Sequence, residues 1–299
     1  MLKAVESPYL APFDGSFRNA QAPTSPPAKA PEKKKCEKQL EELIGELDEI
    51  QRKLYAHDRY AVLLIFQAMD AAGKDSTIRS VLRGVNPAGC QVFSFKQPGM
   101  EELQHDFLWR TSRCLPERGR IGVFNRSYYE EALVVRVHPE FLKLQKLPSP
   151  PDLKNIWQER YESIRDHEKH LARNGTVIIK FWLNVSFETQ TRRFLSRMEH
   201  PDKNWKFSDG DLAERRFWNS YMQAYEDVLN ATSRPWAPWY AIPADDKSFM
   251  HLAVADIIVR NLETLGCDYP TLEKSERLKW EKMRDLLKKE VLEEGKGKH

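Results

Sequence analysis

Two kinds of apolar pattern alternate along most of the chain. Short runs that are continuously apolar are expected for strands covered on both faces. These runs span 60–67, 90–95, 120–125, 176–185 and 238–244. Between them, apolar residues recur every three or four positions, which predicts amphipathic helices. The helical segments span 36–56, 76–85, 101–115, 153–175, 187–199 and 209–230, with one more before 148 and others after 244. This alternation predicts an α/β fold, a three-layer sandwich in which helices cover both faces of a parallel sheet.

The two ends of the chain are expected to lie outside the α/β domain. Residues 1–35 are rich in proline and in small polar residues, so we expect an extended arm, pinned by Tyr9, Leu10 and Phe13. One α/β domain is predicted over 36–270 and a C-terminal helix over 271–299.

Composition and charge narrow the class of protein. The chain has 41% hydrophobic and 30% charged residues, which is typical of a globular protein with a real core. Its 47 basic and 44 acidic residues nearly cancel, to a net charge of +3, so we expect no nucleic-acid partner. No apolar run is long enough to span a bilayer, and the four cysteines are far apart in the sequence. We therefore expect no membrane association and a reducing, cytoplasmic location.

One loop carries a motif with a chemical meaning. The stretch "QAMDAAGKDST" (67–77) resembles a Walker A loop, but Ala68 replaces the first glycine and Asp75 replaces the hydroxyl residue. It lies between a predicted strand and a predicted helix, where free N–H groups and the helix dipole bind anions. Gly73 permits close approach of a phosphate, and Lys74 can reach its oxygen atoms. The alternative is a simple helix N-terminus.

The usual magnesium positions of such a loop are both altered. A hydroxyl residue after the lysine and an aspartate at the end of a second strand normally hold Mg²⁺. Here these places hold Asp75 and Asn125. Because Mg²⁺ requires a hard oxygen ligand, we expect Asp70 to be the metal ligand. The alternative for Asp70 is a turn-forming residue.

The third predicted strand ends in "FNRS", which places Arg126 and Ser127 at its carboxyl end. Ligands bind at this edge of parallel sheets, and an arginine there can pair with a phosphate. The alternative for Arg126 is an ion pair with Glu130 or Glu131.

Three separated segments resemble the polyphosphate kinase 2 family. They read "DAAGKDS", "FNRSYYEE" and "DKNWKFSDGDLAERRFWNSYMQAYEDVLNATSRPWAPWYAIPADDK", and the resemblance extends from about residue 36 to 265. It implies a P-loop kinase-like fold with a helical lid over about 190–235. It also implies phosphoryl transfer between inorganic polyphosphate and nucleotides, with Mg²⁺ as cofactor and Mn²⁺ as a substitute, in a homodimer or homotetramer.

The resemblance assigns roles to particular residues. Asp70, Lys74, Arg126 and Glu130 are implied to be catalytic, with Asp70 also holding the metal. Glu130 stands where members that phosphorylate only ADP usually have asparagine, so the chain resembles the subgroup that acts on both AMP and ADP. The positions implied to bind substrate phosphates are Ala71, Ala72, Gly73, Asp75, Ser76, Ser127, Arg193, Arg197 and Lys206.

A polymer of phosphates needs a row of cations. Arg193 and Arg197 lie four residues apart and so share one helix face, where they could clamp the transferred phosphoryl group. Their alternative is a solvated, charged surface. Four further cations could extend the row: Arg79, Arg83, Lys96 and Arg136. The alternative for each of them is an ordinary surface charge.

The sequence thus predicts a reversible, polyphosphate-dependent kinase of AMP and ADP that produces ATP, with guanine nucleotides as further candidate substrates. The alternatives are an ATP-dependent kinase of a nucleoside monophosphate or another small molecule, and a P-loop protein that binds nucleotide or polyphosphate without turnover. Ala68 and Asn125 favour the last alternative, whereas Asp70, Lys74 and Arg126 speak against it.

Overall fold

The computed structural model describes residues 3–206 and 209–296, apart from the side chains of residues 206, 209 and 292–296. The chain divides into two compact units, one that ends at Cys267 and one that begins at Asp268. The second unit contains a single long helix, α10 (Lys274–Lys296). Among the described residues, no helix combines the length and the apolar character needed to cross a membrane.

The first unit is built on a sheet of five strands that are all parallel. The strands are β1 (Ala61–Gln67), β2 (Cys90–Ser94), β3 (Ile121–Asn125), β4 (Thr176–Asn184) and β5 (Trp239–Pro243). Their order across the sheet is β2-β3-β1-β4-β5, so β1 lies in the centre. Every residue of β1 and β5 is buried, which agrees with their continuous apolar runs. The five predicted strands and their parallel arrangement are confirmed.

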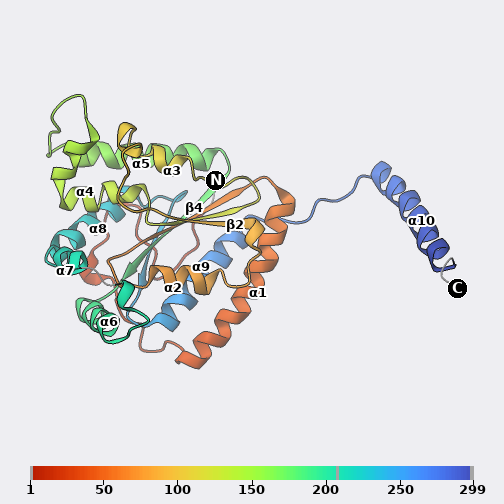
Figure 1. The fold of residues 1–299 in the computed structure, drawn as a ribbon, viewed down its shortest axis with the longest axis horizontal. Helices are drawn as coiled ribbons and strands as arrows, with labels where there is room; N and C mark the ends of the chain where they lie inside the picture. Colours follow the sequence, from red (N-terminus) through yellow and green to blue (C-terminus); the bar gives the residue numbers. More distant parts are fainter. Residues whose placement is uncertain (1–2, 207–208, 297–299) are drawn as a thin grey trace. The chain divides into compact units, whose positions relative to one another are not determined.

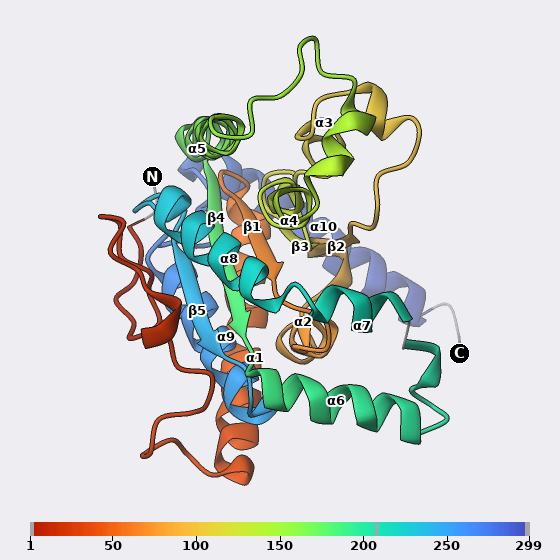
Figure 2. The same ribbon diagram turned by 90° about the vertical axis from the view of Figure 1, so that its left-hand side faces the viewer.

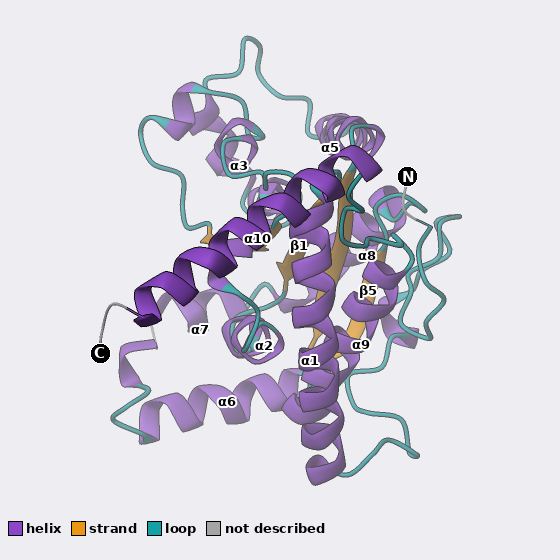
Figure 3. Ribbon diagram, turned by 90° about the vertical axis from the view of Figure 1, so that its right-hand side faces the viewer, coloured by secondary structure: helices purple, strands orange, loops and turns teal. Residues whose placement is uncertain are grey.

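Helices cover both faces of this sheet, as Figures 1 and 3 show. One layer contains α1 (Lys33–His57), α2 (Lys74–Val81) and α9 (Lys247–Glu263), and α9 contacts both of the others. The opposite layer contains α5 (Ile156–Arg173) and α8 (Trp218–Thr232), which contact each other. The predicted three-layer α/β sandwich is therefore confirmed.

The remaining elements are short, except for α6. They are η1 (Asn19–Gln21), η2 (Pro87–Gly89), η3 (Glu102–Gln104), α3 (Trp109–Ser112), η4 (Tyr128–Glu131), α4 (Val134–Val137), η5 (Pro139–Gln145), α6 (Phe187–Glu199), η6 (Asn204–Lys206) and α7 (Asp209–Arg215). The single helix predicted over 101–115 is wrong, because η3 and α3 are separate. Asp106 interrupts it, since its carboxylate accepts a hydrogen bond from the Leu108 amide and offers the backbone an alternative to the helix.

Two other predicted helices are also shorter than expected. The segment before 148 is split into α4 and η5, because Pro139 has no N–H group to continue a helix. The segment 209–230 is divided into α7 and α8, and the amide of Phe217 at the division bonds to the carbonyl of Glu214 in a tight turn.

The N-terminal arm lies along the free edge of β5 (Figure 2). The Ala11 amide donates to the Trp239 carbonyl at 2.9 Å, and the Ala241 amide donates to the Tyr9 carbonyl at 2.7 Å. Phe17 is buried and meets the ring of Trp182 edge to face. The arm thus satisfies backbone groups that would otherwise be exposed at a sheet edge.

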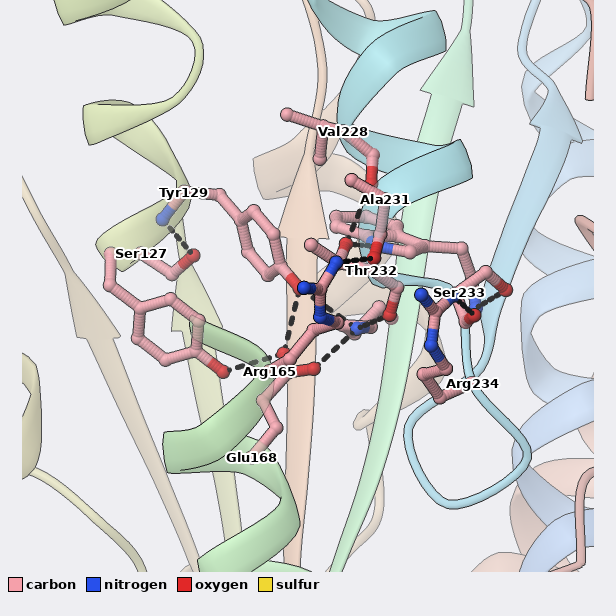
Figure 4. Close-up of polar contacts among 12 residues, drawn as sticks. Ser127, Tyr129, Arg165, Glu168, Val228, Ala231, Thr232, Ser233 and Arg234 are labelled. Carbon is pink, nitrogen blue, oxygen red and sulfur yellow. Dashed lines mark hydrogen bonds and ion pairs between the residues drawn. The ribbon is translucent and has the colours of Figure 1, made fainter. Parts of the chain in front are cut away.

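A buried ion pair fixes the layer of α5 and α8 against the sheet. Lys180 of β4 and Glu168 of α5 are 0% and 1% exposed, and their charged groups lie 2.7 Å apart. The Lys180 ammonium also donates to the Tyr129 hydroxyl and to the Thr232 carbonyl. Figure 4 shows Tyr129, Glu168 and Thr232 converging from η4, α5 and α8. Since η4 begins two residues after Arg126, this cluster holds the segment that carries the candidate site.

Candidate active site

The phosphate-type loop lies at the carboxyl end of the central strand, as the sequence predicts. It joins β1 to α2, and Gly73 precedes the first helical residue with a φ of 109°. This backbone angle favours glycine, and a Cβ atom at Gly73 would also lie close to side-chain atoms of Met250, at 3.1 Å, and Ser76, at 3.3 Å. Ala71 also has a positive φ, of 59°. Ala68 does not, which explains why alanine is accepted where a Walker A loop has glycine.

Lys74 lies inside this loop. Its side chain is buried and its ammonium donates to the Ala68 carbonyl at 2.8 Å. Burial, and next the positive charge of Arg126, lower the pKa of Lys74 to about 8. The carboxylates of Asp70, Glu130 and Asp75 act in the opposite direction. A bound phosphate would add negative charge at this point and favour the protonated ammonium.

Arg126 links the loop to the neighbouring strand. Its guanidinium donates to the Asp70 carboxylate at 2.7 Å and to the Glu130 carboxylate at 3.1 Å. Its φ is 65°, which is uncommon for a residue other than glycine and turns the side chain out of the end of β3. The pKa of Arg126 is raised, above all by Glu130. A guanidinium has five N–H donors, so Arg126 can hold both carboxylates and still bind a phosphate. The ion pair with Glu130, which is the alternative that the sequence leaves open for Arg126, is present in the structure, and phosphate binding by Arg126 stays a prediction.

The two altered magnesium positions contact each other. The Asn125 amide donates to the Asp75 carboxylate at 2.7 Å. In the ordinary loop the acidic group ends the strand and the hydrogen-bonding partner begins the helix. Here the carboxylate stands on the helix and the amide stands on the strand. The chain therefore keeps one negative charge at this point, on the opposite partner.

A cavity of about 270 Å³ adjoins Arg126 and Glu130, which both form part of its wall. Apolar side chains of Phe107, Val135 and Phe141 line it, together with charged side chains of both signs, among them Lys96 and Asp106. Apolar walls with a few convergent polar groups are typical of small-molecule sites. The cavity could therefore take the uncharged part of a ligand whose charged part lies at Arg126.

The predicted cations of the lid lie in different surroundings. Arg193 donates to the carbonyls of Ala71 and Ala72 at 3.1 and 2.7 Å. It also donates to the Ala244 carbonyl at 2.6 Å. Arg197 pairs with Asp211 of α7 at 3.3 Å. The side chain of Lys206 lies outside the described residues.

Several other candidates have structural contacts. The Ser76 hydroxyl donates to the Gly73 carbonyl at 2.8 Å, and the fully buried Ser127 hydroxyl accepts from the Tyr129 amide and so caps η4. Arg83 pairs with Glu41 of α1, while Arg79 is exposed on α2.

Arg136 also has partners in the fold. Its guanidinium bonds to the Asp227 carboxylate and to the Tyr161 hydroxyl.

Two residues near the site have no counterpart in the sequence prediction. Gln190 of α6 is 1% exposed and donates to the Asp70 carbonyl at 2.9 Å. Tyr225 of α8 is buried against Trp182, and burial, followed by the charge of Glu130, raises its pKa well above the usual range. Sequence patterns could not identify either residue. Tyr225 lies in an apolar helical stripe like any core residue, and Gln190 is a single glutamine in a helix with many charged residues.

Comparison with known proteins places this geometry in a family. The family model described as Polyphosphate kinase 2 matches residues 30–268. An ADP-polyphosphate phosphotransferase from Rhodopseudomonas palustris is 56% identical over 247 residues, 82% of this chain and 86% of that protein. An AMP/ADP-polyphosphate phosphotransferase from Meiothermus ruber is 44% identical over 227 residues, 76% and 81% of the two chains.

Comparison of the fold with solved structures gives the same family. A crystal structure of polyphosphate kinase 2 from Arthrobacter aurescens superposes with a TM-score of 0.80 at 34% identity, covering 93% of this chain and 98% of that one. Sequence and fold agree over the segment that contains the loop, Arg126 and the cavity. The chain belongs to the polyphosphate kinase 2 family.

Proposed function

We propose that this chain transfers the terminal phosphoryl group of inorganic polyphosphate to AMP or ADP, in a reversible reaction. The observation that carries the proposal is the position of Arg126, which bridges Asp70 of the phosphate-type loop and Glu130 in the wall of the cavity. A donor phosphate in the loop and an acceptor phosphate beside the cavity would therefore meet at one guanidinium. The relatives named as polyphosphate phosphotransferases support this assignment.

The reaction requires positioning more than covalent chemistry. A terminal phosphate oxygen of the acceptor attacks the end phosphorus of the polymer and forms a new P–O bond. The P–O bond to the bridging oxygen breaks, and the shortened polymer leaves with that electron pair. Lys74 and the loop N–H groups hold the transferred phosphoryl group, while Arg126 neutralises charge between the two anions. Reversal returns the phosphoryl group from nucleotide to polymer.

The acceptor nucleotide fits the cavity beside Arg126. Its base would lie among Phe107, Val135 and Phe141, and its phosphates would point to Arg126. Inorganic polyphosphate has no base and needs only cations, so the polar loop suits the donor. This division explains how one site accepts two unlike anions.

The residues present fit a magnesium ion. Asp70 and Asp75, which precede and follow Lys74 in the sequence, offer hard carboxylate oxygens, and both act electrostatically on its ammonium. Among the described residues, no group of three or more acidic, histidine or cysteine side chains could hold a metal by itself. Mg²⁺ is commonly bound by one or two carboxylates together with substrate phosphates and water. We propose Asp70 and Asp75 as its protein ligands, with Mn²⁺ as a substitute; when bound, the ion neutralises phosphate charge.

An exchange of the two paired residues tests this role of Asp75. Asp75→Asn is expected to raise the Mg²⁺ concentration for half-maximal activity by about 10- to 100-fold. The double variant Asp75→Asn/Asn125→Asp restores one carboxylate and one amide, so it should need less Mg²⁺ than Asp75→Asn. Titrations of ATP formation against Mg²⁺ measure both values, and electron paramagnetic resonance of Mn²⁺ with bound ADP reports metal binding without turnover.

Asn125→Asp alone provides the matched control. It places two carboxylates in contact, and like charges in such a pair repel. If the double variant binds Mn²⁺ as weakly as Asp75→Asn does, the carboxylate at this point is not a metal ligand.

The function itself is tested without ATP in the assay. With Mg²⁺, polyphosphate and ADP, the chain should produce ATP, and with AMP it should produce ADP. An ATP-dependent kinase of AMP could form ATP from two ADP molecules, but it would do so equally without polymer, and it would give no ADP from AMP and polyphosphate alone. A non-catalytic binding protein would give no product with any donor. Reactions without polymer and without Mg²⁺ are the controls, and GMP and GDP test the range of bases.

Two further properties stay predictions. The resemblance implies a homodimer or homotetramer, which light scattering can measure. All four cysteines are free thiols, which suits the reducing cytoplasm that we propose as the location.

A further inference from the structure

Helix α6 holds the main chain of the phosphate-type loop from one side. Three successive loop carbonyls accept hydrogen bonds from its side chains: Asp70 from Gln190, and Ala71 and Ala72 from Arg193. Figure 2 shows α6 leaving the end of β4 beside the start of α2. The donors to the loop thus come from the segment that the sequence assigns to a lid.

The direction of these carbonyls matters for an anion. A peptide unit has its carbonyl and its N–H on opposite sides, so carbonyls drawn toward α6 direct the N–H groups of Ala71 and Gly73 to the phosphate side, while the Ala72 N–H donates to the Met69 carbonyl at 3.2 Å. Positive φ angles at Ala71 and Gly73, between residues of ordinary φ, bend the backbone into the concave form that binds anions. A carbonyl that turned inward would instead repel a phosphate.

Both the nitrogen and the oxygen of the Gln190 side-chain amide form hydrogen bonds. Its nitrogen donates to the Asp70 carbonyl at 2.9 Å, and its oxygen accepts from Arg215 of α7 at 3.3 Å. The side chain is 1% exposed, so it has little access to solvent as an alternative partner. A buried amide of this kind is fixed in one orientation by its partners.

The first two turns of α6 are themselves fixed to the body of the fold. Ser186 caps the helix by accepting from the Thr189 amide, and its own amide donates to Asp245 at 2.8 Å. Arg193 also reaches the carbonyls of Ala244 and Asp245 after β5. Gln190 lies between these two anchors and is therefore held rigidly against the loop.

We propose that Gln190 is a positioning residue for phosphoryl transfer, which holds the Asp70 carbonyl away from the substrate and so sets the direction of the loop N–H groups and of the Asp70 carboxylate. This inference rests on the proposed function. Arg193 shares the task, at the next two carbonyls. Gln190 touches no substrate and acts only through the loop.

Gln190→Met keeps the length and the helix preference of the side chain and removes both hydrogen bonds. We expect kcat for ATP formation from polyphosphate and ADP to fall by about 10²-fold, since small displacements of reacting groups have effects of this size. KM for ADP should change by less than about threefold, because the acceptor cavity is untouched. Gln190→Glu, which cannot donate at neutral pH, should lower kcat at least as far.

Amide hydrogen exchange provides the readout that does not depend on activity. In Gln190→Met the amides of residues 70–75 should exchange faster, while those of the sheet and α5 keep their rates. Gln158→Met is the matched control, since Gln158 is a glutamine on the exposed face of α5 whose side chain donates to Glu162; it should change neither kcat nor exchange.

The outcomes separate the inference from the proposed function. An unchanged kcat in Gln190→Met, or faster exchange spread over the whole fold, overturns the positioning role. A wild-type chain that makes no ATP from polyphosphate overturns the proposed function. In that case, localised exchange in the loop of Gln190→Met still supports the role of Gln190 in shaping the anion site.

Discussion

Replacing Lys74 with methionine is expected to lower kcat for ATP formation from polyphosphate and ADP by about 10³-fold, the loss found when a preorganised donor is removed. The ammonium is buried inside the loop and donates to the Ala68 carbonyl. Methionine keeps the length of the stem and removes the charge that would stabilise the phosphoryl group in transfer. Steady-state assays of ATP formation measure the loss.

Stability should move in the opposite direction. Because the pKa of Lys74 is lowered to about 8 in the folded chain, burying its ammonium at pH 7 is unfavourable, and methionine removes that penalty. We therefore expect Tm of Lys74→Met to stay the same or to rise. Lys38→Met, on the exposed face of α1, is the control for a general effect of this substitution. A Lys74→Met enzyme that keeps more than a tenth of the wild-type kcat would contradict the assigned role.

The main features of the fold and the centre of the site were accessible from the sequence. Continuous apolar runs predict the strands, because a strand covered on both faces has no polar side to alternate with. The loop motif then follows a strand and precedes a helix, so its place at the edge of the sheet follows from the order of elements. Arg126 meets Asp70 because β1 and β3 are neighbours, with Phe66 opposite Asn125 in register.

What the sequence could not give depends on tertiary contacts. The spacing of Arg193 and Arg197 places both on one helix face, but Arg193 bonds to loop carbonyls and Arg197 to Asp211. Helical spacing fixes a direction from the axis and does not say what lies there. The pairing of Asn125 with Asp75 likewise requires the relative height of a strand end and a helix start. Whether Arg193 and Arg197 also meet substrate stays a prediction.

The partner of the buried Lys180 in the core likewise could not be predicted from the sequence. A single lysine within the apolar run "TVIIKFWLNV" indicates a buried charge with a partner, but any of the chain's acidic residues could be that partner. The structure selects Glu168, which also accepts from the hydroxyls of Tyr128 and Tyr129. All three groups that meet Glu168 are buried, so its charge contributes to the position of η4 and hence of Glu130.

Glu168→Gln should therefore destabilise the fold strongly. It leaves the Lys180 ammonium buried without an opposite charge, and breaking one side of such a pair lowers the free energy of unfolding by about 3–5 kcal/mol. In a chain of this size about 1 kcal/mol corresponds to roughly 2–4 °C, so a fall in Tm of about 6 to 20 °C is expected. Lys180→Met should have a similar effect, because it leaves the carboxylate unpaired. Differential scanning calorimetry measures both.

The double variant Lys180→Met/Glu168→Gln distinguishes a lost charge balance from lost packing. It has no buried charge at these two positions, and the glutamine carbonyl can still accept from the two tyrosine hydroxyls, so it should be more stable than either single variant. Asp48→Asn, which breaks the exposed pair with Arg52 on α1, is the matched control and should change the free energy of unfolding by less than about 1 kcal/mol. If the destabilisations of the two single variants simply add in the double variant, the pair does not act as a unit, and Lys180 and Glu168 hold η4 by shape alone.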